Sequence, residues 1–92
     1  MEKKRVLMTV SGLVQGVGFR YYVQRNANSN RVTGYVKNLS NGSVEAVFEG
    51  ESSRVNILVE YTKKGPFGAH VSSFRIIEEP FKDEFESFEV RR

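Results

Sequence analysis

The residues most able to do chemistry in this chain lie in one glycine-rich stretch, positions 11–20, with the sequence SGLVQGVGFR. Glycines allow a backbone to curl so that successive N–H groups converge on one point and bind an anion. Arg20 closes the stretch, and a guanidinium can donate two parallel hydrogen bonds to a tetrahedral oxyanion. The stretch therefore predicts an anion site. A tight loop beside a solvated arginine is the alternative that these residues alone leave open.

Two common nucleotide-binding loops do not fit this stretch. The dinucleotide fingerprint G-x-G-x-x-G is matched by Gly16 and Gly18, but Tyr21 stands where the third glycine is needed. A Walker A loop ends in Gly-Lys-Ser/Thr, which the sequence lacks. Neither mismatch excludes an anion site formed by backbone N–H groups. The helix expected after Arg20 would add its partial positive charge to such a site.

Hydrophobic periodicity indicates the elements that must position this loop. Helical spacing begins at Phe19, Asn41-Gly42 is a strong hairpin signal, and Gly65-Pro66 ends a second helical pattern. We expect strands at 5–12, 33–39, 43–48, 71–77 and 85–90, and helices from 19 to about 30 and from about 52 to 64. A polar excursion over 78–84 separates the last two strands.

This order predicts an α+β fold, a ferredoxin-like sandwich with β-α-β-β-α-β topology and an extra C-terminal strand. Two helices are expected on one face of an antiparallel sheet. The 92 residues contain no linker, repeat or low-complexity tract, so we expect a single domain over residues 1–92.

Composition narrows the range of functions. The chain has no cysteine, which excludes disulfides and Cys-ligated metals, and its one histidine, His70, cannot build a metal site. Fourteen basic and eleven acidic residues give a net charge of +3, which is weak evidence for a nucleic-acid partner. No apolar run is long enough to span a bilayer. We expect a cytoplasmic protein with no membrane or nucleic-acid partner.

Two motifs resemble the signatures of the acylphosphatase family. The first is Gln15-Gly16-Val17-Gly18-Phe19-Arg20, similar to G-x-V-Q-G-V-x-F-R. The second is Gly34-Tyr35-Val36-Lys37-Asn38 followed by Asn41-Gly42-Ser43-Val44-Glu45, similar to G-[aromatic]-V-x-N…G-x-V-E. The two occur in the expected order, and the resemblance covers nearly the whole chain. It implies a ferredoxin-like enzyme that hydrolyses the carboxyl-phosphate bond of acyl phosphates without metal or cofactor.

The resemblance also implies roles for individual residues. Arg20 would bind the phosphoryl group, and Asn38 would position the attacking water. The backbone around the phosphoryl group would come from Gln15, Gly16, Val17, Gly18 and Phe19. The expected partners are a small acyl phosphate as substrate and inorganic phosphate as product, and we expect a monomer.

The chain departs from the family pattern at two places. Asn30-Arg31-Val32 stands where members often have Leu-Gly-Leu, and the chain ends in Arg92 where many have an aromatic residue. Losing the glycine alters the end of the first helix, although Asn30 can also adopt the left-handed conformation that caps a helix. Neither departure affects Arg20 or Asn38.

Two other functions remain open at this stage. RNA-recognition domains share the β-α-β-β-α-β order, but their aromatic RNP1 motif lies on the third strand, and 44–49 here lacks it. The second is an accessory domain that keeps the anion-binding loop but catalyses no reaction.

Overall fold

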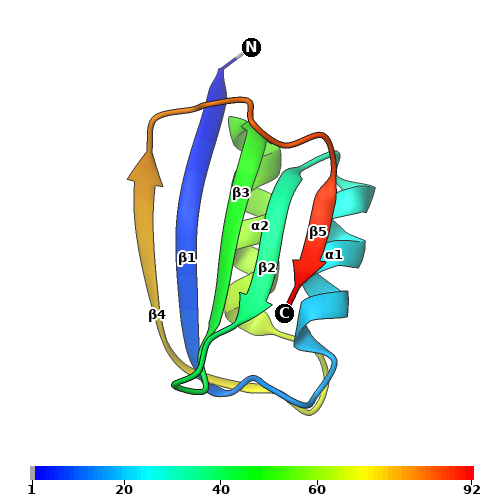
Figure 1. Cartoon of the computed structure of the whole chain (residues 1–92), viewed down its shortest axis with the longest axis vertical. Helices are drawn as coiled ribbons and strands as arrows, with labels where there is room; N and C mark the ends of the chain where they lie inside the picture. The colour runs from blue at the N-terminus through cyan, green and yellow to red at the C-terminus, as the bar shows by residue number, and fades with distance from the viewer. Residues whose placement is uncertain (1) are drawn as a thin grey trace.

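The computed structural model describes residues 2–92 and contains one five-stranded sheet with both helices on one face (Figure 1). The elements in chain order are β1 (Lys3–Leu13), α1 (Phe19–Ser29), β2 (Thr33–Asn38), β3 (Val44–Glu51), α2 (Ser52–Lys64), β4 (His70–Glu79) and β5 (Phe88–Arg91). The strand order across the sheet is β4-β1-β3-β2-β5. The expected ferredoxin-like fold is therefore confirmed.

The direction of β5 differs from the expectation of an antiparallel sheet. The β1–β3, β1–β4 and β2–β3 pairs are antiparallel, but β5 runs parallel to β2. The reason is the crossing over 80–87, which carries the chain from β4 at one edge to the far edge of the sheet (Figure 1). The chain then enters β5 in the direction of β2, so the sheet is mixed.

The core lies between the helices and one face of the sheet. Helix α1 buries Phe19, Val23 and Ala27, as its helical spacing predicts. Helix α2 buries four residues at helical spacing, and alternate positions of β1 are buried beneath the helix layer. These α2 and β1 residues are Val55, Leu58, Val59 and Thr62, and Val6, Met8 and Val10. In the part of the chain that the structure describes, no helix is long and apolar enough to cross a membrane.

The end of α1 uses a residue that the sequence did not indicate. Asn30 has φ of −106°, whereas Arg31 has φ of 57°, so the left-handed residue is Arg31 and not Asn30, the residue suggested for it. The backbone N–H of Val32 donates to the carbonyl of Ala27, and that of Arg31 donates to Asn28. This is the Schellman arrangement, in which the residue after the cap takes the left-handed conformation. Arg31 therefore carries backbone strain that glycine would avoid.

A buried carboxylate holds the crossing over 80–87 in place. Glu49 on β3 is 1% exposed, and its two oxygens accept hydrogen bonds from the backbone N–H groups of Lys82, Asp83 and Glu84 at 2.8, 3.1 and 3.1 Å. Arg5 donates to Glu49 at 3.3 Å and to Glu79 at 2.9 Å, and it also pairs with Glu84. Residues 85–87 remain outside the last strand, which begins at Phe88 and not at 85 as expected.

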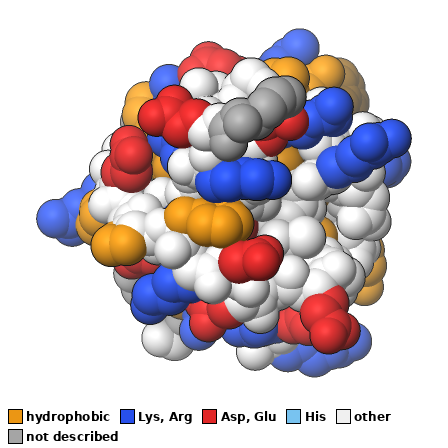
Figure 2. Space-filling view, turned by 90° about the horizontal axis from the view of Figure 1, so that it is seen from above, with side chains coloured by type: hydrophobic (Ala, Val, Ile, Leu, Met, Phe, Trp, Pro, Cys, Tyr) orange, Lys and Arg blue, Asp and Glu red, His pale blue; other side chains and the backbone are white. Residues whose placement is uncertain are grey.

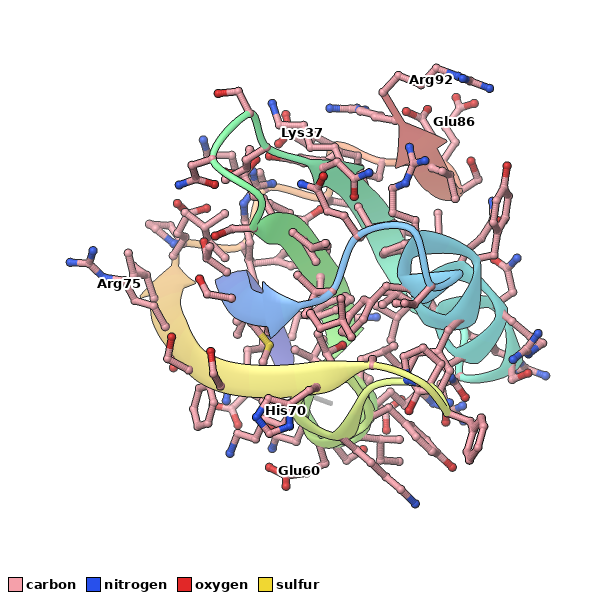
Figure 3. The ribbon with its side chains drawn as sticks, turned by 90° about the horizontal axis from the view of Figure 1, so that it is seen from below. Lys37, Glu60, His70, Arg75, Glu86 and Arg92 are labelled. Atoms are coloured by element: carbon pink, nitrogen blue, oxygen red, sulfur yellow. The ribbon has the colours of Figure 1, made fainter. Side chains whose placement is uncertain are left out.

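At the end of the molecule that carries the crossing over 80–87, acidic and basic side chains are mixed. The space-filling view from above shows acidic and basic side chains next to one another (Figure 2). The anion loop lies at the opposite end, which is the end seen from below in Figure 3.

Candidate active site

The loop between β1 and α1 has the backbone conformation that an anion cradle needs. Gly16 and Gly18 have φ of 76° and 75°, in the left-handed region that other residues rarely adopt. A Cβ at either position would meet no atom within 4 Å, so the backbone on that side is open. Gly18 is also the N-cap of α1, so the unpaired N–H groups of the first helical turn begin where the loop ends.

A small pocket lies against this loop. Its volume is about 100 Å³, and it is lined by Val14, Gly16, Gly18, Phe19, Arg20, Tyr21 and Asn38. A space of this small size suits a group such as a phosphoryl group.

The pocket brings the two sequence motifs together. Arg20 comes from the first turn of α1, and Asn38 is the last residue of β2, yet both line the same small space. Arg20 is half-buried, and its Nη1 donates to the backbone carbonyl of Arg91 on β5 at 2.9 Å. That bond fixes one side of the guanidinium, since β5 is itself paired with β2.

Asn38 presents an unusual oxygen. Its Oδ1 is buried and accepts no hydrogen bond from any residue that the structure describes. Buried acceptors in proteins are nearly always paired with a protein group, water or an ion, so this oxygen calls for a bound partner. An oxygen of this kind, in a pocket with backbone donors and an arginine, suits a water molecule that must be held in one orientation.

Two residues that were predicted to form the phosphate cradle do not line the pocket. Gln15 and Val17 are not among the residues lining the pocket, and Val17 packs partly buried against the core. The Gln15 side chain donates from Nε2 to the carbonyl oxygens of Leu39 and Ser43 at 2.8 and 2.9 Å. Its side chain thus joins two loops, and the part played by its backbone in binding stays a prediction.

The pocket differs from a metal site in its electrostatics. Arg20 is the one charged residue among those that line it, and the N-terminus of α1 adds a partial positive charge. Within residues 2–92, no group of three or more His, Cys, Asp or Glu side chains is arranged to hold a metal ion. His70 is exposed at the start of β4.

Comparison with known proteins supports what this geometry suggests. The acylphosphatase family model matches residues 6–90. The chain belongs to the acylphosphatase family. An acylphosphatase of Geobacter metallireducens is 46% identical over 89 residues, covering 97% of this chain and 96% of the relative.

Solved acylphosphatase structures agree with the fold as well. The acylphosphatase of Coxiella burnetii has a TM-score of 0.90 and 43% identity, covering 97% of this chain and 93% of that one. The acylphosphatase of Bacillus subtilis has a TM-score of 0.92 and 32% identity, covering 97% and 99%. The family activity is hydrolysis of small acyl phosphates, and this chain is a member of that enzyme family.

Some residues that line the pocket were not among the expected site residues. Val14 lines the pocket and is fully buried, and Tyr21 lines it while remaining 60% exposed. In the sequence, Tyr21 stood out only because it replaced the third glycine of a nucleotide loop. The carbonyl of Arg91 has no sequence signature at all, because every residue carries one.

Proposed function

We propose that this protein holds the phosphoryl group of an acyl phosphate between the loop at 15–19, the first turn of α1 and Arg20. Asn38 orients the water that attacks the phosphorus. The observation that carries this proposal is the buried Oδ1 of Asn38, an acceptor without a partner among the described residues, in the same small pocket as Arg20.

The chemistry suits a pocket with few side chains. Attack by water forms a new P–O bond and breaks the bond between phosphorus and the carboxyl oxygen, which leaves as a carboxylate. A carboxylate is a good leaving group, so little help from a general acid is needed. Backbone N–H groups and Arg20 counter the charge on the phosphoryl oxygens in the transition state. Most of the rate acceleration would then come from positioning and electrostatics.

Asn38 acts as an orienting group in this scheme. Its amide oxygen accepts a hydrogen bond from the water and aims it, but an amide cannot take up a proton at neutral pH. The proton is therefore assigned to an oxygen of the substrate phosphate. No step requires a metal, in keeping with the donors that line the pocket.

Two substitutions separate the two roles. Hydrolysis of acetyl phosphate would be followed in the presence of a chelator, with inorganic phosphate as a competitive inhibitor. Arg20→Ala should weaken phosphate inhibition and lower kcat/KM by about 100-fold or more. Asn38→Ala should lower kcat by about 100-fold while phosphate inhibition stays within a few-fold of wild type.

Exposed residues of the same types serve as controls. Arg25 and Asn28 on α1 are exposed and do not line the pocket, so Arg25→Ala and Asn28→Ala should leave the kinetics unchanged. An Arg20→Ala enzyme with wild-type turnover would refute the assignment of the pocket. Full activity in Asn38→Ala would refute the role of the amide but would leave the assignment of the pocket in place.

A further inference from the structure

Gln15 joins the two halves of the candidate active site. It lies between Val14 and Gly16, both of which line the pocket. Its side-chain nitrogen uses both hydrogens, one on the Leu39 carbonyl at 2.8 Å and one on the Ser43 carbonyl at 2.9 Å. The amide nitrogen is therefore fully engaged with the turn between β2 and β3, and both distances are typical of hydrogen bonds.

The two carbonyls that Gln15 binds mark the base of that turn. The N–H of Leu39 donates to the carbonyl of Ser43 at 2.8 Å, which closes the turn around residues 40–42. The N–H of Ser43 donates to the Asn41 side chain at 3.0 Å, and the Ser43 hydroxyl lies 2.8 Å from that of Ser11. The base of the turn is thus a rigid anchor, while its tip is exposed.

Asn38 lies directly before this anchor. It pairs with Val44 as the last residue pair of β2 and β3, and Leu39 is the next residue along the chain. A shift of the turn relative to the β1–α1 loop would therefore move Asn38 relative to Gly16 and Gly18. In oriented reactions, a displacement of about 1 Å can cost about 100-fold in rate.

We propose that Gln15 is a positioning residue that fixes Asn38 at the correct distance from the phosphoryl cradle, and so controls turnover more than phosphate binding. The proposal rests on the proposed function, because it needs Asn38 to orient the water. It differs from the role implied by the family motif, in which Gln15 belongs to the substrate-binding loop. Glutamine suits the task because one nitrogen supplies two donors at the end of a flexible side chain.

The test compares two substitutions at this position. Gln15→Met keeps the length and removes both donors, and Gln15→Asn keeps the amide on a side chain one carbon shorter. For acetyl phosphate we expect Gln15→Met to lower kcat by about 10- to 100-fold and Gln15→Asn to lower it less. Inhibition by inorganic phosphate should stay within about three-fold of wild type in both, since the backbone cradle and Arg20 are unchanged.

A control separates positioning from general loss of stability. Tyr22→Phe removes another bond from a side chain to a backbone carbonyl, between Tyr22 and Tyr61, and leaves the turn intact. It should keep wild-type kcat. Thermal unfolding of all variants would show that they are folded at the assay temperature.

A double-mutant cycle decides whether Gln15 acts through Asn38. If it does, Gln15→Met combined with Asn38→Ala should lose no more activity than Asn38→Ala alone. Losses that multiply would overturn the proposal, and so would weakened phosphate inhibition that matches the loss of kcat. Failure of the proposed function has a different signature, namely full turnover in the single variant Asn38→Ala.

Discussion

Replacing Glu49, which does not line the pocket, with glutamine should weaken the fold strongly. The Glu49 carboxylate accepts three backbone N–H bonds from residues 82–84 and a fourth bond from Arg5. An amide of the same shape has only one acceptor oxygen, so its NH₂ group would face at least one N–H donor. The variant Glu49→Gln would therefore leave buried donors unpaired and release the crossing to β5.

The size of the effect follows from these contacts. Breaking a buried, hydrogen-bonded ion pair costs about 3–5 kcal/mol. Arg5 keeps Glu79 and Glu84 as partners, which places the expected loss near the lower limit, at about 3 kcal/mol. At about 4–8 °C per kcal/mol for a domain of this size, Tm should fall by about 12–24 °C.

The loss should also depend on pH in a defined direction. Burial alone would raise the pKa of Glu49, but the N–H groups of residues 82–84 and Arg5 outweigh it, and the net pKa lies below its ordinary value. A depressed carboxyl pKa stabilises the fold above the unfolded value of about 4.3, and that stabilisation is lost as the pH falls through the folded value. The difference in unfolding free energy between wild type and Glu49→Gln should therefore be constant from pH 6 to 8 and should become smaller in acid.

Urea unfolding followed by circular dichroism at pH 7 and pH 3.5 would measure this gap. Glu60 pairs with Lys63 on the surface of α2, and its side chain is 72% exposed, so Glu60→Gln should change the unfolding free energy by less than about 0.5 kcal/mol. A loss below about 1 kcal/mol for Glu49→Gln at pH 7, or a gap that widens in acid, would refute the reasoning.

Three further outcomes can be measured by thermal unfolding. Arg31→Gly relieves a φ of 57° at the end of α1 and should stabilise the protein by about 0.5–1 kcal/mol; an unchanged or lower Tm would count against the strain. Gly34→Ala places a Cβ 1.8 Å from the Val47 carbonyl oxygen and should cost at least about 3 kcal/mol. Its control Gly42→Ala, with open space around the Cβ and φ of 94°, should cost only about 1 kcal/mol. Inorganic phosphate should raise the Tm of wild type but not that of Arg20→Ala, and equal shifts in both would contradict the pocket assignment.

The order of helices and strands could be predicted from the sequence because hydrophobic periodicity indicates which face of each element is buried. Phe19, Val23 and Ala27 follow the helical period, and the buried residues of β1 alternate as a strand requires. The path of 80–87 was not readable in this way. It depends on a charged residue, Glu49, that is buried because three distant backbone N–H groups satisfy it. Periodicity carries no information about such contacts.

The site was predictable to a similar degree. Glycines before a helix and an arginine in its first turn indicate an anion loop on physical grounds alone. The meeting of Arg20 with Asn38 followed only from resemblance to a family, because no local rule joins the end of one strand to a loop earlier in the chain. The structure places both at one pocket, while their catalytic roles stay predictions.

The contacts that set the site geometry share a feature that explains why sequence alone did not show them. Arg20 donates to the carbonyl of Arg91, and Gln15 donates to the carbonyls of Leu39 and Ser43. In each case the acceptor is backbone, so the acceptor position can hold almost any side chain without losing the bond. Only the donor residue is constrained. At Arg31 and Arg92 this chain departs from the family pattern. Neither residue lines the pocket, so these two departures can leave the site intact.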